Sequence, residues 1–317
     1  MIPFLLRRFG FILVTLLLAS LIIFGVTQLL PGDVAQVVLG QFATETAVEN
    51  LRRELGLNRP LYSQYLDWAG GFLKGDWGDS LVSRMPVQPM IISRLRNSAM
   101  LAGLALIFYV PLGIILGVVA ALNKEKLLDQ AITGISMAFV GLPEFVTGLL
   151  LITFLAIGLG WFPANSSIDP GSSFFEALPY LILPALTVSL TSLGYIARMT
   201  RSGTIDVLRA DYVRAAELKG LPGRQVLLRH VLRNALLPTV TVVAMGIGWL
   251  IGGLIVTETV YGYPGLGRLL VYAIQRRDLP LIQAGSMIVV LIYALSNLAA
   301  DLLYSLLNPR IRVGKRA

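Results

Sequence analysis

The sequence contains no cysteine and a single histidine among its 317 residues, and only 14% of the residues are charged. The absence of cysteine excludes a disulfide framework, a thiolate nucleophile and a cysteine-bound zinc site. One histidine leaves little for metal ligation or for acid–base catalysis. A soluble domain of this length carries about a quarter charged residues, so the composition also excludes an ordinary cytosolic enzyme.

The residues that are present are mostly apolar, with 56% hydrophobic residues and a mean hydropathy of +0.75. A bilayer span needs about 20 mostly apolar residues. The first qualifying segment is longer than a signal-peptide core, and we interpret it as a retained span. An even number of spans places both ends of the chain on one side of the membrane. Six segments predict transmembrane helices: 9–30, 99–122, 130–157, 180–197, 236–260 and 283–307.

The basic residues are distributed unequally between the two sides of these predicted spans. The side of the termini carries sixteen Lys and Arg, whereas the two short loops of the other side carry three, Arg268, Arg276 and Arg277. Lys and Arg gather in the cytoplasmic loops of membrane proteins. The asymmetry predicts that both termini are cytoplasmic, and it explains the net charge of +8 without nucleic acid.

The long segment 31–97 on the outer side differs in composition, with seven basic and seven acidic residues. It predicts a short helix over 46–55 that ends at Gly56, followed by an amphipathic helix from Pro60 to Gly75. This small subdomain has two interpretations, a cap that shields the ends of the spans or a docking surface for an external partner.

The connection between the fourth and fifth predicted spans reads as a helix, a turn and a second helix. Thr204 is expected to cap the first helix, and Gly220 with Pro222 is expected to end it. Ala215 and Ala216 leave a flat patch to which another backbone can approach closely. The second helix has an apolar and a basic face, which also suits a helix lying on anionic lipid headgroups.

Sequence motifs distinguish these alternatives. Ala215 and Ala216, followed by Gly220, resemble the E-A-A-x-x-x-G coupling loop of permease subunits in ATP-binding-cassette (ABC) importers. Arg214 stands where the general motif has Glu, and His230 with Arg233 replaces its later Ile and Pro. At these positions the sequence resembles the peptide and nickel branch of the family, whose permeases carry the same Arg, His and Arg.

Longer segments extend the resemblance over nearly the whole chain. Residues 211–220 resemble the D-Y-V-R-x-A-x-x-K-G sequence of that branch, and 229–238 its R-H-x-L-R-N-A-x-x-P sequence. Residues 258–270 resemble its E-x-V-F-x-x-P-G-L-G-R-L-L sequence, while 55–65 and 75–80 resemble the first outer loop. That loop marks the first, or B-type, permease of a pair.

The resemblance implies an all-α membrane protein with the six transmembrane helices of a type I ABC importer domain over residues 1–317. Within it, 31–97 would form an external subdomain and 198–235 the cytoplasmic coupling helices. The implied partners are a second homologous permease, two ABC ATPases, an external substrate-binding protein and membrane lipid, but no nucleic acid. The implied location is the bacterial cytoplasmic (inner) membrane.

The resemblance leaves the solute open between peptides, nickel, glutathione and opines. Scarce His and absent Cys disfavour a metal-lined path. The sequence lacks the G-x-x-x-x-G-K-[ST] phosphate loop, so the chain is not expected to hydrolyse ATP. We therefore expect ATP and Mg²⁺ on partner subunits and no cofactor or metal in this chain.

Three acidic residues, Glu144, Glu258 and Asp301, lie within or at the ends of spans, where a carboxylate is costly. Glu144 is the deepest and follows Pro143, so it is a candidate either for the translocation pathway or for a structural bond. Glu258 and Asp301 favour structural or interfacial roles. The expected coupling residues are Arg214, Ala215, Ala216, Gly220, Arg229, His230 and Arg233. The expected outer gate or docking residues are Glu258, Tyr261, Pro264, Gly265 and Gly267.

Two other functional classes fit less well. An ion-coupled secondary transporter is expected to show a proton relay or inverted repeats with broken helices, and neither is visible in the sequence. An intramembrane enzyme is disfavoured because the single histidine, His230, falls in the basic connection rather than opposite a nucleophile inside a span.

Overall fold

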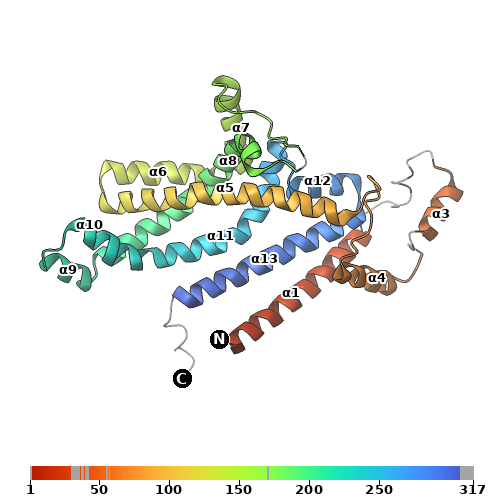
Figure 1. Cartoon of the computed structure of the whole chain (residues 1–317), viewed down its shortest axis with the longest axis horizontal. Coiled ribbons are helices and arrows are strands. Elements are labelled where there is room, and N and C mark those ends of the chain that lie inside the picture. Colours follow the sequence, from red (N-terminus) through yellow and green to blue (C-terminus); the bar gives the residue numbers. More distant parts are fainter. Residues whose placement is uncertain are drawn as a thin grey trace. The chain divides into compact units, whose positions relative to one another are not determined.

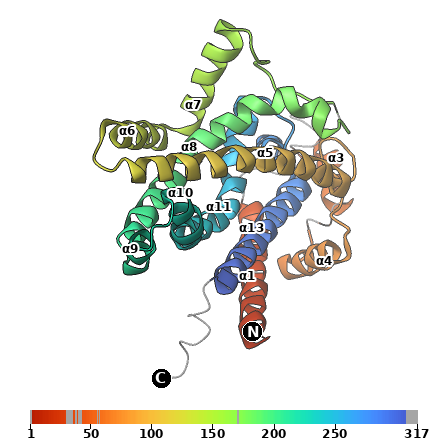
Figure 2. The same cartoon turned by 60° about the vertical axis from the view of Figure 1, so that its left-hand side comes forward.

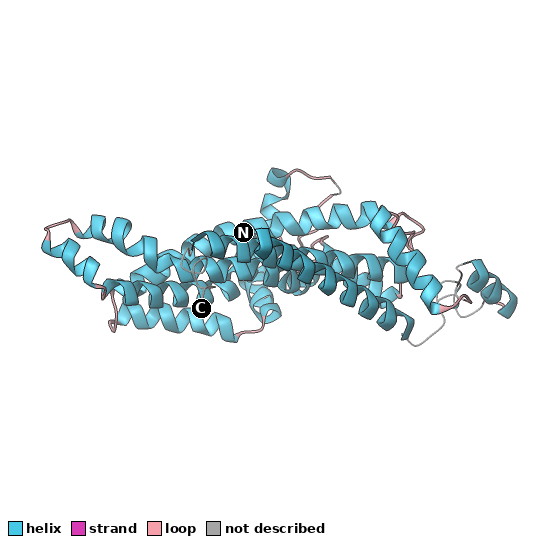
Figure 3. Cartoon of the chain, turned by 90° about the horizontal axis from the view of Figure 1, so that it is seen from below, coloured by secondary structure: helices cyan, strands magenta, loops and turns pink. Residues whose placement is uncertain are grey.

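The computed structural model describes residues 2–29, 36, 39, 43–54, 56, 58–169 and 171–307, which form helices joined by loops (Figure 3). Within these residues the strand-like pairing is one isolated bridge between Asp79 and Pro86. Figure 1 labels the α-helices, and two π-helices, η1 and η2, lie between them in the chain. The helices in chain order are α1 (Ile2–Leu29), α3 (Glu45–Glu54), α4 (Leu61–Lys74), α5 (Val87–Leu122), α6 (Leu127–Gly141), α7 (Glu144–Leu151), η1 (Ile152–Gly158), α8 (Phe174–Leu208), α9 (Asp211–Leu218), α10 (Gly223–Gln225), η2 (Val226–Val231), α11 (Leu232–Val260), α12 (Leu266–Arg276) and α13 (Leu279–Leu307).

Packing divides the chain into two compact units. Unit 1 comprises Met1–Asn97 and Pro264–Ala294, and unit 2 comprises Ser98–Tyr263 and Leu295–Ala317. Helices α5 and α13 each contribute residues to both units. The expected single domain over 1–317, with its subdomains at 31–97 and 198–235, stays a prediction.

Five stretches of helix are long and apolar enough to cross a membrane, and they lie in α1, α5, α8, the α10–η2–α11 run and α13. They correspond to five of the six predicted spans. The helices extend beyond the apolar runs; α5, for example, begins at Val87 rather than near residue 99. An apolar run records the part of a helix that suits lipid, whereas the helix itself continues as long as its backbone hydrogen bonds do.

The remaining predicted span, 130–157, is a broken helix rather than a straight one. Helix α6 and the α7–η1 helix meet at an angle of 107° (Figure 2). The break falls at Leu142, whose backbone is extended with φ −83° and ψ 133° because it precedes a proline. Pro143 is the N-cap of α7 and has no N–H with which to continue α6. Counted as one bent span, the pair brings the candidate spans to six.

Helix α8 is the central element of unit 2 and contacts both α6 and α11. Glycines allow the backbones of these helices to approach each other. A side-chain carbon added at Gly203 of α8 would lie 2.5 Å from the carbonyl oxygen of Ala235 in α11, and one added at Gly194 would lie 2.6 Å from that of Ser136 in α6. Large apolar residues fill the rest of the core, among them Leu101, Leu104, Tyr109, Leu181, Val188, Ile196, Leu250 and Leu254.

Unit 1 has its own core, formed by the first turns of α5 with α12 and α13. The two helices predicted in the outer segment are confirmed. Helix α3 ends just before Gly56, which has a φ of +66°, although Leu55 lies outside the described residues. Helix α4 follows its N-cap Pro60 and ends at Gly75, whose φ of 86° is left-handed. Each glycine stands where an L side chain would be strained.

The contact of Gly203 with α11 generates a stability prediction. We expect Gly203→Ala to lower the melting temperature of the purified protein, because the added methyl group meets a backbone carbonyl that no rotamer change can remove. Overpacking of this kind costs about 1–3 kcal/mol. Gly134→Ala in α6 is the matched control, since nothing lies within 4 Å of its added carbon. The control is expected to leave stability equal or higher, by up to about 1 kcal/mol. Equal melting temperatures for the two variants would contradict the packing.

Candidate functional site

The segment that connects α8 to α11 adopts the expected helix, turn and helix. Helix α9 ends at Leu218, and Gly220 follows with a left-handed φ of +76°. The expected capping role of Thr204 is wrong, because Thr204 lies inside α8 and is fully buried. Helix α8 instead continues to Leu208, and α9 starts after Ala210 without a side-chain cap. Periodicity located the two helices but not the position of the break between α8 and α9.

A small apolar core lies under this segment and is formed by Val213, Ala216, Val226, Val231 and Ala235. The π-helix η2 explains this set, because an i→i+5 register aligns Val226 with Val231 on the buried face. A regular α-helical register groups Val226 instead with the polar residues of the basic face. Ala216 is therefore covered by the chain itself, so Ala215 alone of the two alanines expected to form a flat patch remains at the surface, and Gly220 is also exposed.

The surface of the segment is basic with large apolar side chains between the charges. Arg214, Arg229 and Arg233 are exposed, and His230 is half-buried. Leu218 is 82% exposed, so this large apolar side chain is almost uncovered by the rest of the chain. An exposed surface that combines cations with leucine side chains is suited to contact a partner of acidic and apolar character.

One hydrogen bond joins α9 of this segment to α11, and a second joins α8 to α11, the two helices that flank the segment. Asn234 Nδ2 in α11 donates to the Tyr212 hydroxyl in α9 over 2.9 Å. The hydroxyls of Thr200 in α8 and Thr239 in α11 share a buried hydrogen bond of 3.0 Å. Together with the contact at Gly203, these bonds make the ends of α8 and α11 a defined base for the residues that are expected to couple.

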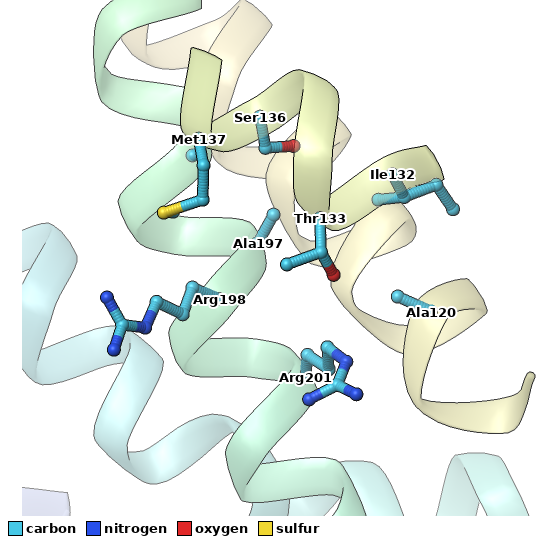
Figure 4. A pocket seen from close by; sticks show the side chains of 9 residues that line it. Ala120, Ile132, Thr133, Ser136, Met137, Ala197, Arg198 and Arg201 are labelled. Atoms are coloured by element: carbon cyan, nitrogen blue, oxygen red, sulfur yellow. The ribbon is translucent and has the colours of Figure 1, made fainter. Parts of the chain in front are cut away.

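The sequence analysis missed a buried ion pair beside this base. Arg201 Nε and Nη2 donate to the two carboxylate oxygens of Asp129 over 2.6 and 2.7 Å. Asp129 is 3% exposed and also accepts from the backbone N–H of Glu125. A small hollow adjoins the pair, and Figure 4 shows Arg201 and Arg198 on α8 opposite Thr133 of α6. The sequence contained one signal for this pair, because Asp129 and Arg201 lie just beyond the ends of two predicted spans, on the same predicted side of the membrane.

Glu144 is the first residue of α7, directly after the break in the helix. Its side chain is half-buried, and the hydroxyl of Thr257 in α11 donates a hydrogen bond to its Oε1 atom. Gly253 makes room for the carboxylate, since a side-chain carbon there would lie 3.1 Å from Glu144 Oε2. The geometry therefore provides both a structural partner and a partly exposed carboxylate.

A second polar contact holds α7 near Glu144. The Tyr261 hydroxyl donates to the Gly148 carbonyl over 3.2 Å and shares a 2.8 Å hydrogen bond with Thr187 of α8. Burial raises the pKa of the Tyr261 phenol to about 12, so the hydroxyl keeps its proton. Thr147, on the adjoining turn of α7, has a buried hydroxyl with no partner in the described part of the chain.

The residues expected at an outer gate or dock are largely buried within their own units. In unit 2, Glu258 is fully buried and accepts a 2.5 Å hydrogen bond from the Ser98 hydroxyl, and Tyr261 is 1% exposed. In unit 1, the Pro264 carbonyl accepts from Asn97 Nδ2 over 2.8 Å and from Arg94 Nη1 over 3.2 Å. Gly265 and Gly267 are also buried. Burial favours a structural role for this turn, and the gate or docking role stays a prediction.

The other polar sites are structural in geometry. Asp278, which the sequence analysis did not select, is fully buried in unit 1 and accepts from the Ser80 hydroxyl and the Leu81 backbone N–H. Asp301 is half-buried in α13. Among the described residues, no three His, Asp or Glu side chains gather in a way that could hold a metal ion.

Comparisons with known proteins match the chain over nearly its whole length. Residues 113–313 match the family model "Binding-protein-dependent transport system inner membrane component", and residues 1–101 match its N-terminal counterpart. Two permease proteins named DppB are similar: a di/tripeptide transport protein of Pseudomonas aeruginosa at 37% identity and a dipeptide transport protein of Escherichia coli K12 at 35%. The glutathione transport permease GsiC of Escherichia coli K12 is 36% identical. Each alignment covers 98% of this chain and 99% of the relative.

A crystal structure of an amino acid ABC transporter with histidines shares 22% identity and covers 70% of this chain and 94% of its own, with a TM-score of 0.48.

The ion pair of Asp129 and Arg201 generates a testable prediction. We expect Arg201→Ala to lower thermal stability strongly, because it leaves the buried Asp129 carboxylate without its charge partner, a loss of about 3–5 kcal/mol. Arg198→Ala is the matched control, since the exposed Arg198 lies on the same helix three residues earlier and its loss costs about 1 kcal/mol or less. In thermal unfolding, the double variant Asp129→Ala with Arg201→Ala is expected to recover part of the loss. A double variant no more stable than Arg201→Ala would contradict the pairing.

Proposed function

The chain belongs to the family of inner membrane components of binding-protein-dependent transport systems, and on this premise we propose that it forms half of the translocation pathway of a peptide importer. Its family and its relatives make it a permease subunit of an ABC importer and a multi-pass protein of the cytoplasmic membrane. The proposal adds the solute, the composition of the complex and the roles of individual residues.

The proposed complex contains this chain, a second homologous permease, two ABC ATPases and an external substrate-binding protein. ATP and Mg²⁺ are bound by the ATPases, and this chain binds no cofactor of its own. The absence of a phosphate-loop motif from the sequence supports this division of labour. Both termini and the segment 198–235 lie on the cytoplasmic side in this proposal, as the excess of Lys and Arg there favours.

Short peptides are the proposed solute. The observation that carries this proposal is the similarity, over 98% of the chain, to relatives named for di- and tripeptide transport. The glutathione permease is nearly as similar, and glutathione is itself a small peptide, so it is the alternative solute. A nickel path is disfavoured because the sequence offers no cysteine and one histidine as ligands.

Uptake into proteoliposomes that contain the assembled transporter and its binding protein tests the solute. We expect ATP-dependent accumulation of a labelled dipeptide that excess unlabelled dipeptide prevents and that Ni²⁺ does not. Accumulation driven by an ion gradient without ATP would support the secondary-transport alternative instead.

We propose that the α9–η2 segment contacts a partner ATPase and transmits its motion. The surface available for this contact contains Ala215, Gly220 and the exposed Arg214, Arg229 and Arg233. His230 is half-buried beside this surface, and Ala216 supports it from the apolar core. A side-chain carbon added at Gly220 meets nothing of this chain within 4 Å, so we expect extra bulk there to extend outward toward the partner.

A substitution at Gly220 tests this role. We expect the complex with Gly220→Leu to keep its association with the binding protein but to lose substrate-stimulated ATP hydrolysis and uptake. Two causes act together: the left-handed backbone penalises Leu, and the side chain projects into the contact. Arg229→Ala is expected to be milder, since an exposed ion pair contributes about 1 kcal/mol or less.

Gly220→Asn separates the two causes, because Asn tolerates a left-handed conformation with a smaller side chain. It is expected to retain more stimulated hydrolysis than Gly220→Leu. Normal stimulated hydrolysis by the assembled Gly220→Leu complex would contradict the coupling role.

We also propose that Glu144 faces the translocation pathway. The proposal rests on its partial exposure at the broken helix and on the cost of a carboxylate within a span. Glu144→Gln keeps the shape and can still accept from Thr257, so the variant is expected to assemble normally and to transport more slowly. Thr257→Val is the structural control, which removes the hydrogen bond but retains the carboxylate. Unchanged uptake kinetics for Glu144→Gln would leave Glu144 with a structural role alone.

A further inference from the structure

Helix α4 carries two apolar stripes, of which unit 1 covers only one. The covered stripe contains the aromatic side chains of Tyr65, Trp68 and Phe72. The other stripe contains the large side chains of Tyr62, Leu66 and Leu73, which are 71%, 63% and 86% exposed. At about 100° per residue, the three exposed positions fall within about 40° of one another and adjoin the covered stripe. The polar residues of α4, among them Asp67 and Lys74, occupy the other side of the helix.

The covered stripe packs against α1, beside the C-terminal half of that helix (Figure 1). The ring of Phe24 lies 5.5 Å from that of Tyr65 and 5.9 Å from that of Trp68. The hydroxyls of Ser20 and Tyr65 share a hydrogen bond of 2.9 Å. These contacts fix the level along α1 at which α4 lies.

That level is inside the membrane. The apolar stretch of α1 is Leu6–Leu29, 24 residues, or about 36 Å at 1.5 Å per residue, against about 30 Å of hydrocarbon. Centred in the bilayer, it places Phe24 about 5 Å and Ser20 about 11 Å inside the hydrocarbon edge. Helices that lie in a membrane interface are buried to a depth of about 5–10 Å. The side chains of α4 that touch α1 therefore reach interfacial depth.

We propose that α4 lies in the membrane interface and that Tyr62, Leu66 and Leu73 contact the acyl chains of the leaflet at the C-terminal end of α1. Helix α1 also exposes large apolar side chains around this level, where Ile22 is 64% and Leu29 is 81% exposed. Lipid suits both surfaces, because each presents large apolar side chains where water would be unfavourable. Tyr62 and Trp68 are of the types that gather at membrane interfaces.

Under this assignment α4 anchors the outer segment to the bilayer, which differs from both a simple cap and a dock for an external protein. The assignment does not depend on the solute or on the coupling residues. It requires only that α1 spans the membrane.

Because the chain has no cysteine, single-cysteine variants allow a spin label to be placed at chosen positions. Two adjacent pairs provide matched sites, each with one residue on the exposed stripe and its neighbour on the polar side: Leu66→Cys with Asp67→Cys, and Leu73→Cys with Lys74→Cys. The labelled chain is assembled with its partners and placed in lipid nanodiscs. Collision rates with oxygen, which concentrates in acyl chains, and with a water-soluble nickel chelate are then measured by electron paramagnetic resonance.

We expect oxygen collisions to exceed chelate collisions at 66 and 73, and the reverse at 67 and 74. Chelate collisions that dominate at 66 and 73 would mean that the stripe faces water, which overturns the proposal. Low rates for both reagents at these positions would mean that another protein surface covers the stripe, which also overturns it. Tyr62→Cys supplies a third position on the stripe if either leucine variant fails to assemble.

Discussion

The close approach of helix backbones along α8 is the constraint on which unit 2 depends. Lipid tails are as apolar as leucine side chains, so helices inside a bilayer are held together mainly by dense van der Waals packing and by hydrogen bonds between them. Glycine permits both, since it brings backbone atoms within reach. Side-chain carbons added at Gly113 and Gly117 of α5 would lie 2.7 Å or less from atoms of α8. Carbons added at Gly194 and Gly203 of α8 would lie equally close to atoms of α6 and α11. This close packing around α8 brings polar side chains on neighbouring helices within hydrogen-bonding distance of their partners.

The polar contacts follow from that packing. A carboxylate in an apolar environment is tolerated when donors are held beside it, because desolvation of the charge is otherwise uncompensated. Asp129 has the guanidinium of Arg201 and a backbone N–H, and Glu258 has the Ser98 hydroxyl. Glu144 also has a hydroxyl donor, Thr257, but differs from these two acids in being partly exposed. This exposure distinguishes Glu144 from the buried acids and is the physical basis of the proposal that it faces a pathway.

The sequence predicted the long helices because a run of about 20 apolar residues has few alternatives to a span. It also predicted α4, where Pro60 and Gly75 mark the two ends. The sequence did not predict the features that depend on tertiary packing or on an unusual helical register. Pro143 indicated a local disturbance, but not a bend of 107°. The π-helix η2 moves Val226 from the polar row to the core, which α-helical periodicity cannot anticipate. The sequence drew attention to Pro264 and its neighbouring glycines, but the burial of this turn depends on side chains such as Asn97, far away in sequence.

Helix α11 connects the two features that we propose to take part in transport. Its first turns carry Ala235 of the core beneath the coupling segment, and its last turn carries Thr257, the partner of Glu144. Its 29 residues extend over about 44 Å, so one element reaches from the coupling segment to the broken helix. The hydrogen bond of Thr239 to Thr200 and the contact at Gly203 hold α11 to α8 near its N-terminal end. Pro238 lies there too and cannot donate to the Asn234 carbonyl, so the helix lacks one backbone hydrogen bond beside its fixed point. A displacement of the coupling segment is therefore expected to pivot the remainder of α11, and with it the hydroxyl that holds Glu144.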